Sequence, residues 1–290
     1  MFQDIKASFM KLLPAQYRQE GPVVPVVRLA GVIGAVSPIR PGMTLASVAP
    51  QLERAFAMKS APVVAILINS PGGSPVQSHL IFKRIRALAE ENKKEVIIGV
   101  EDVAASGGYL IALAGDVIIV DPSSVVGSIG VVSAGFGFEK LIEKIGIERR
   151  VYTAGESKAM LDPFQPEKEA DVQHLKSLQR DVHDMFIDLV RARRGERLAD
   201  DPTLFSGAFW SGTRGLELGL VDRVGDIRSY LRGRFGDKLR LALIAPKRGL
   251  LARFGRGGAG GLASAAIATN MVESAVSTLE ERAYWSRFGL

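Results

Sequence analysis

Four short glycine-containing segments carry the residues that could do chemistry. They read NSPGG at 69–73, ASGGY at 105–109, GSIG at 127–130 and GESK at 155–158. The first three coincide with the ends of predicted strands, which is where open α/β sheets build their sites. Together the segments supply serine hydroxyls, a lysine and closely spaced backbone N–H groups, which are the parts of a nucleophilic acyl-transfer site.

Ser106 is the candidate nucleophile. Two glycines follow it, and the residues at 106–114 predict a short buried helix. A serine at the start of such a helix exposes its hydroxyl on a tight turn, and the N–H groups after it can bind an oxyanion. Serine is also a favourable helix N-cap, so the local pattern alone fits a structural role as well.

The base that this serine needs is Lys158 in our interpretation. The three histidines, His79, His174 and His183, fall in stretches typical of helix surfaces and have no obvious aspartate partner. Lys158 instead precedes an apolar stretch at 159–164, and a lysine can act as a base if burial keeps its amine neutral. A loop lysine without a role is the alternative. Ser128 could orient the amine through its hydroxyl.

Composition and missing motifs narrow the chemistry further. The chain has 290 residues and no cysteine, which excludes disulfides, thiolate nucleophiles and Cys-ligated metals. The glycine segments match neither GxxxxGK[ST] nor GxGxxG, and Ser106 does not lie in GxSxG. We therefore expect no metal, no nucleotide and no organic cofactor.

Strand-type runs alternate with amphipathic helices along most of the chain. The run 61–69 is short, almost continuously apolar and rich in branched residues, as in a strand buried on both faces. Other strands are predicted at 22–36, 95–100, 117–120, 127–132 and 149–153, and helices at 76–91, 139–145, 166–194 and 213–218. This alternation implies right-handed crossovers and an α/β fold.

Both ends of the chain differ from this pattern. We predict an amphipathic segment at 1–21, a main domain at 22–245, and a basic linker with a C-terminal helix at 246–290. Residues 228–256 contain nine Lys and Arg residues and one acidic residue. Because the net charge of the whole chain is +6, the rest of the chain is close to neutral. Such a segment can lie on anionic lipid, whereas no motif indicates a nucleic-acid partner. The longest apolar runs are about seven residues, against about 20 for a membrane span.

The four segments, in this order, resemble those of the signal peptide peptidase A family of Ser–Lys serine peptidases, which includes protease IV and the SohB-like proteins. The spacing agrees as well, since 33 residues separate Gly73 from Ser106, 22 separate Ser106 from Ser128, and 52 separate Ser106 from Lys158. The resemblance covers about residues 24–228. It implies the crotonase/Clp-protease-like superhelix of ββα units.

The resemblance also implies a role for each site residue. Ser106 would be the nucleophile, Lys158 the general base, Ser128 the residue that orients Lys158, and Gly73 and Gly107 the oxyanion donors. The resemblance further implies peptide or protein substrates, with a small or apolar residue before the cleaved bond. It also implies a homo-oligomer, in which the base is supplied within a chain or by a neighbour. Family members usually carry a transmembrane anchor, which this sequence lacks. We therefore expect a cytoplasmic protein, with peripheral contact at the inner face of the membrane as one option.

Two other functions stay open. A crotonase-like enzyme acting on an acyl thioester would use similar paired N–H donors with a carboxylate base, for which Glu101 and Asp102 are candidates. A membrane-surface scaffold would depend on its assembly and have little activity of its own.

Overall fold

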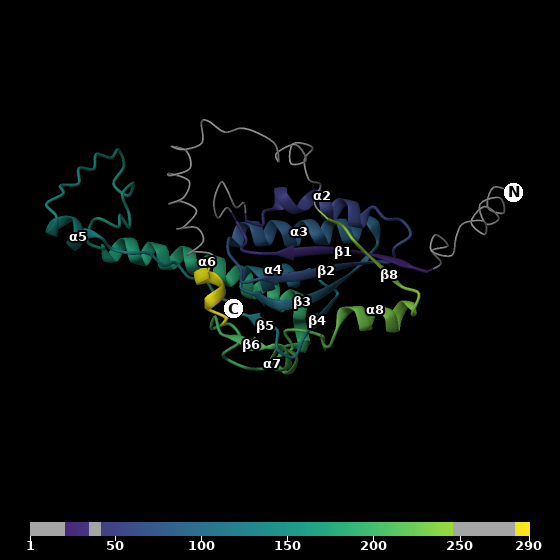
Figure 1. Ribbon diagram of the computed structural model, residues 1–290. Helices are drawn as coiled ribbons and strands as arrows, with labels where there is room; N and C mark the ends of the chain where they lie inside the picture. Colours follow the sequence, from purple (N-terminus) through teal and green to yellow (C-terminus); the bar gives the residue numbers. More distant parts are fainter. Residues whose placement is uncertain (1–20, 35–41, 246–281) are drawn as a thin grey trace, which may run out of the picture.

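The computed structural model describes residues 21–34, 42–245 and 282–290, and a single sheet lies at their centre (Figure 1). Six strands cross it in the order β6-β5-β3-β2-β1-β8, while β4 pairs with β3 and β7 with β4. Only β5 and β6 pair in antiparallel orientation. The strands are β1 Val23–Ala30, β2 Val63–Ser70, β3 Glu95–Ala105, β4 Val117–Val120, β5 Val125–Gly127, β6 Phe209–Ser211, β7 Arg223–Val224 and β8 Arg240–Leu243.

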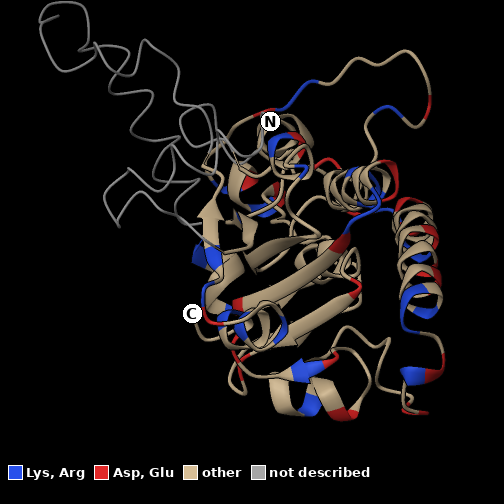
Figure 2. Ribbon diagram, turned by 90° about the vertical axis from the view of Figure 1, so that its right-hand side faces the viewer, with Lys and Arg blue, Asp and Glu red and all other residues tan. Residues whose placement is uncertain are grey.

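The central strands are apolar because both of their faces are covered. All residues of β2 are buried except Leu67, as predicted for the run 61–69. Figure 2 shows the same contrast, since the strands carry few charged residues while the surface helices carry many. The parallel order with helical connections confirms the predicted α/β class.

Strand β3 changes partner along its length, and this creates the edge at which the site lies. Residues 97–100 pair with β4, whereas residues 103–105 pair with β5. On the other side, the register with β2 shifts between Ile68 and Ser70. As a result, β3 ends beside β5, with Ala105 opposite Gly127.

Helices cover both faces of the sheet (Figure 1). On one face α2 (Leu45–Phe56), α3 (Pro75–Asn92), α4 (Gly107–Ala112) and the second half of α6 (Glu169–Arg194) enclose the larger core. On the other face α8 (Ile227–Phe235) encloses a smaller one. The remaining helical elements are α5 (Glu139–Lys144), the 3₁₀ turn η2 (Gly195–Arg197) and α7 (Gly212–Glu217).

Helix α2 is not predicted from the sequence, and Pro50 inside it is the reason, because proline usually ends a helix. Its start is held by a capping box. The Ser47 N–H donates to the Thr44 hydroxyl over 3.2 Å, and the Thr44 N–H donates to the Ser47 hydroxyl over 3.0 Å. Burial of Leu52 and Phe56 against the sheet then stabilises the helix despite the proline.

Residues 132–168, which we call the arm, stand clear of the sheet and its helices (Figure 1). Most of their side chains are exposed. The arm has a small cluster of its own, in which the tilted rings of Phe138 and Phe164 lie with centroids 5.6 Å apart and Arg149 pairs with Asp162. The predicted strands at 127–132 and 149–153 are wrong here. Residues 128–132 leave the sheet after Gly127, and 149–153 have no neighbouring strand.

Most of the predicted C-terminal helix lies outside the described residues, as do the predicted amphipathic segment, apart from Gly21, and most of the basic linker. Residues 282–286 are helical. Within the described residues, no helix is both long and apolar enough to cross a bilayer.

Candidate active site

Ser106 lies between the end of β3 and the start of α4 in a strained backbone conformation. Its φ is 52° and its ψ is −122°, a region that costs a residue with a Cβ about 1–3 kcal/mol. Its N–H donates to the Gly127 carbonyl over 2.8 Å, and its carbonyl accepts from the Leu110 N–H over 3.0 Å. The side chain does not cap the helix, and no described residue hydrogen-bonds to its hydroxyl. The hydroxyl is therefore held in a fixed place and remains available.

The turn after β2 brings a second stretch of backbone against Ser106. A Cβ on Gly72 would lie 2.8 Å from the Ser106 Cβ, and one on Gly73 would lie 2.1 Å from the Ile33 carbonyl oxygen. Ile33 also fixes this turn, because its N–H donates to the Gly72 carbonyl and its carbonyl accepts from the Ser74 N–H, both over 2.8 Å. Only glycine fits this close approach of two backbones.

Two backbone N–H groups in this region are unoccupied. Neither Gly73 nor Gly107 donates its N–H to a described residue. The Gly107 N–H is free because the first N–H groups of a helix have no acceptor within it. A Cβ on Gly107 would lie 2.3 Å from the Ser78 hydroxyl, so this position also excludes a side chain. Free N–H groups close to a nucleophile can stabilise an oxyanion.

Ser128 lies at the end of the neighbouring strand. Because Ala105 pairs with Gly127, Ser106 and Ser128 follow directly after paired residues of parallel strands. Ser128 also has a positive φ, 53°, and it is buried. Its N–H donates to the Ala208 carbonyl over 2.7 Å, whereas its hydroxyl has no described partner. The structure thus brings Ser106, Ser128, Gly73 and Gly107 to one edge of the sheet.

A small, mostly apolar pocket opens beside Ser106. Two glycine turns, the start of α4 and one side of α6 form its wall. Its lining residues are Gly73, Pro75, Ser106, Gly107, Leu110, Gly130, Val131, Val182, Met185 and Phe186. Within the part of the chain that the structure describes, neither a carboxylate nor a lysine lines it. It can accept a small apolar side chain next to the hydroxyl.

Lys158 is not brought to this pocket within the chain. It lies in the exposed arm, in the turns that follow α5, and its amine has no described partner. The apolar stretch at 159–164, from which burial of the lysine was predicted, is itself only partly covered, and Leu161 is 36% exposed. The sequence does not predict that the arm stands clear of the sheet and its helices. Apolar residues predict burial, but they do not indicate which surface buries them.

The alternative bases are occupied elsewhere. Glu101 accepts three hydrogen bonds from the Arg28 guanidinium, two at 2.9 Å and one at 2.6 Å, and Asp102 accepts from the Asn69 amide over 2.6 Å. All three histidines lie on helices as predicted, and the His183 ring hydrogen-bonds the Ile129 carbonyl over 3.0 Å. Among the described residues no group of His, Asp and Glu is arranged to hold a metal ion. The thioester alternative therefore lacks a carboxylate at the pocket.

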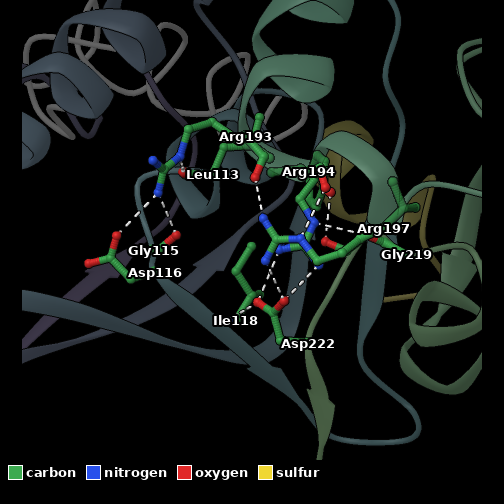
Figure 3. Close-up of polar contacts among 11 residues, drawn as sticks. Leu113, Gly115, Asp116, Ile118, Arg193, Arg194, Arg197, Gly219 and Asp222 are labelled. Carbon is green, nitrogen blue, oxygen red and sulfur yellow. Dashed lines mark hydrogen bonds and ion pairs between the residues drawn. The ribbon is translucent and has the colours of Figure 1, made fainter.

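An arginine cluster that sequence analysis missed joins α6 to the far end of α4 (Figure 3). Arg193 donates to the Leu113 and Gly115 carbonyls, both over 2.8 Å. Arg194, almost fully buried, donates twice to the Asp222 carboxylate at 3.0 and 2.9 Å. Arg193 thus joins α6, which lines the pocket, to the end of the helix that follows Ser106, and Arg194 joins α6 to Asp222.

Burial and pairing act in opposite directions on Asp222. Burial raises its pKa, but hydrogen bonds from Arg194 and the Ile118 N–H, together with the nearby guanidinium charges, outweigh it and lower the pKa below its usual value. Tyr109, buried next to this cluster, donates its hydroxyl to the Leu220 carbonyl over 2.7 Å, and burial raises its pKa. Both groups hold their ordinary neutral-pH charge states and serve the fold.

Comparison with known proteins decides the family. Residues 88–232 match peptidase family S49. A Synechocystis protein described as a protease is 32% identical over 204 residues, which cover 67% of this chain and 72% of that protein. The chain belongs to peptidase family S49. This confirms the resemblance to the signal peptide peptidase A and SohB-like proteins.

Other relatives place this S49 chain in a wider context. A Brucella abortus protein named Na⁺/H⁺ antiporter NhaA is 56% identical over 285 residues, which cover 97% of this chain and 39% of that protein. The chain thus spans about two fifths of the length of that relative. A solved structure of the membrane-bound stomatin-specific protease 1510-N aligns with a TM-score of 0.48 and 17% identity, covering 79% of this chain and all of that one.

Proposed function

We propose that this S49 chain is a serine endopeptidase that uses Ser106 as its nucleophile. The observation that carries the proposal is the combination at Ser106 of a strained turn with a hydroxyl and two nearby N–H groups that no described residue binds. A fold keeps a strained residue only when the surroundings hold it there, and such residues concentrate at active sites. Membership of a peptidase family supports the same reading.

The residues divide the reaction as follows. The neutral Lys158 amine takes the proton of the Ser106 hydroxyl while Oγ attacks the peptide carbonyl carbon. The Gly73 and Gly107 N–H groups hold the tetrahedral oxyanion, each contributing about 3 kcal/mol at the barrier. The intermediate then collapses, and the Lys158 ammonium gives its proton to the departing amine. A water molecule, losing a proton to the lysine, hydrolyses the acyl-serine and restores both groups.

A neighbouring copy supplies Lys158 in this proposal. The arm that carries the lysine stands away from its own pocket, and it exposes a set of large apolar side chains. These are Val132, Phe136, Phe138, Leu141, Ile145, Ile147, Val151, Tyr152 and Leu161. Docking the arm on a second subunit would bury them and desolvate the amine, which favours its neutral form. Ser128, unpartnered beside Ser106, would orient the incoming amine.

The pocket beside Ser106 sets the substrate preference. Leu110, Val182, Met185 and Phe186 line it, so a small apolar residue before the cleaved bond fits best. Extended peptide can add main-chain hydrogen bonds at Val131 and Val132, whose backbone groups pair with no described residue.

A labelling experiment tests the nucleophile. A fluorophosphonate should modify the wild-type protein at Ser106 and leave Ser106→Ala unmodified. Ser123→Ala, which changes an exposed serine on the turn between β4 and β5, is the matched control and should label like the wild type. Equal labelling of Ser106→Ala and the wild type would rule out this nucleophile.

We also propose that the chain works at a membrane surface. The Brucella relative contains a segment like this chain within a longer protein named Na⁺/H⁺ antiporter NhaA. The basic stretch at 228–256 supplies charge that anionic lipid attracts. Flotation with vesicles containing anionic lipid should recover the protein at low salt, and vesicles of neutral lipid should not. Equal recovery with both lipids, or none with either, would contradict this location.

A further inference from the structure

The end of the chain packs directly behind the nucleophile. Phe288 is 8% exposed and forms a separate apolar cluster with Val103 and Ala105 of β3. Trp285 and Val125 pack against the same cluster. Ala105 is the last residue of β3 and directly precedes Ser106. The C-terminal residues therefore contact the strand end that sets the position of the Ser106 hydroxyl.

This cluster covers a part of the sheet that no other described element covers. Side chains of a strand alternate between its two faces, and Ala104 faces the larger core while Val103 and Ala105 face the other way. Helix α8 covers that second face farther back, over Ile97 and Ile119. Without the C-terminal residues, the face beneath the catalytic edge would be open to solvent.

The same residues also contact the strands that place Ser128. The Phe288 ring meets the Phe209 ring edge-on, with centroids 5.1 Å apart, and Phe209 pairs with Gly127. Strands β5 and β6 are three residues long each. Strands this short have few hydrogen bonds of their own, so packing on one face contributes much of what holds them.

We propose that Trp285 and Phe288 are positioning residues, which hold the ends of β3 and β5 so that Ser106 and Ser128 keep their strained conformations. The role deepens the proposed peptidase function and rests on it for its effect on catalysis. The geometric part stands independently, because the packing of Phe288 on Val103 and Ala105 does not depend on what Ser106 does. These residues touch neither substrate nor the reacting atoms.

The test compares two truncations in the C-terminal residues, one at Tyr284 on the short helix and one at Phe288 in the turn that follows it. Phe288→Ala removes a buried ring, and Tyr284→Ala removes a ring that is 38% exposed and serves as the matched control. Amide hydrogen exchange is measured in the full chain over residues 103–108 and 125–129. We expect at least tenfold faster exchange there in Phe288→Ala, unchanged exchange in β1 and β2, and wild-type exchange in Tyr284→Ala. Phe288→Leu, which keeps most of the apolar contact, should recover most of the protection.

Rates of fluorophosphonate labelling and of peptide cleavage add the catalytic readout. Phe288→Ala should label and cleave at least tenfold more slowly, with kcat lowered and KM little changed. Unaltered exchange at 103–108 in Phe288→Ala, or equal loss of protection throughout the sheet, would overturn the positioning role. Wild-type protein that neither labels at Ser106 nor cleaves peptide would overturn the proposed function, while the exchange data would still decide the role of the C-terminal residues.

Discussion

At the scale of single residues, the site is made by conformations that side chains normally avoid. Ser106 and Ser128, on neighbouring strand ends, both have φ near +50°, and Gly73 meets Ile33 too closely for any Cβ. The sequence could predict which residues these are, because serine and glycine recur in four ordered segments. It could not predict the backbone strain, because the conformations depend on hydrogen bonds to residues distant in sequence. The Ser106 N–H donates to the Gly127 carbonyl, and the Ser128 N–H donates to the Ala208 carbonyl.

Strain at Ser106 predicts a stability difference between two inactive variants. Ser106→Gly relieves the positive φ, whereas Ser106→Ala keeps it. We expect Ser106→Gly to be about 1 kcal/mol more stable than Ser106→Ala, since strain relief outweighs the extra freedom of glycine in the unfolded chain. Urea unfolding of both variants measures the difference, and a more stable alanine variant would argue against strain at this position.

The close contact at Gly73 predicts a large effect of substitution on kcat. Gly73→Ala would place a Cβ 2.1 Å from the Ile33 carbonyl, so the turn must shift and carry its N–H away from the oxyanion position. We expect kcat to fall at least a hundredfold, as for loss of an oxyanion donor. Gly233→Ala, at a helical glycine whose added Cβ meets nothing within 4 Å, is the control and should keep wild-type kcat.

At the scale of elements, the helices that form the site are fixed from behind. Arg193 and Arg194 join the last turn of α6 to the end of α4 and to Asp222, so the helix that lines the pocket and the helix that follows Ser106 are held by neighbouring arginines. The amphipathic pattern predicts α6 well, and its basic last turn suggests only a helix end. The buried pairing is not visible in the sequence, because Asp222 is 28 residues away.

This anchor predicts a pH-dependent contribution to stability. Arg194→Met leaves the half-buried Asp222 carboxylate without its main partner and should lower the free energy of unfolding by about 3 kcal/mol at pH 7. Because the folded pKa of Asp222 is depressed, the wild-type pair contributes above the unfolded pKa, about 3.9, and loses this contribution as pH falls through the folded pKa. Unfolding curves should therefore differ most at neutral pH and converge in acid. A constant difference down to pH 2 would contradict the pairing.

At the scale of the whole molecule, the arm is the feature whose exposed apolar side chains a single copy of the chain does not bury. It holds Lys158 and many exposed apolar side chains, while the pocket holds Ser106 without a base. The sequence predicts Ser106 and Lys158 as candidate catalytic residues, but the α/β pattern does not indicate which surface would bury the lysine. Helix α2 was missed for a local reason, Pro50, whereas the position of Lys158 depends on how copies assemble.

The central claim is that Ser106 of one copy works with Lys158 of another. Ser106→Ala and Lys158→Ala should each be inactive alone. Mixing them under conditions that exchange subunits should restore peptide cleavage, because some pockets then combine an intact serine with an intact lysine from the neighbour. Restored cleavage at a substantial fraction of the wild-type rate is the predicted result. No recovery in mixed oligomers, shown by mass to contain both variants, would contradict it.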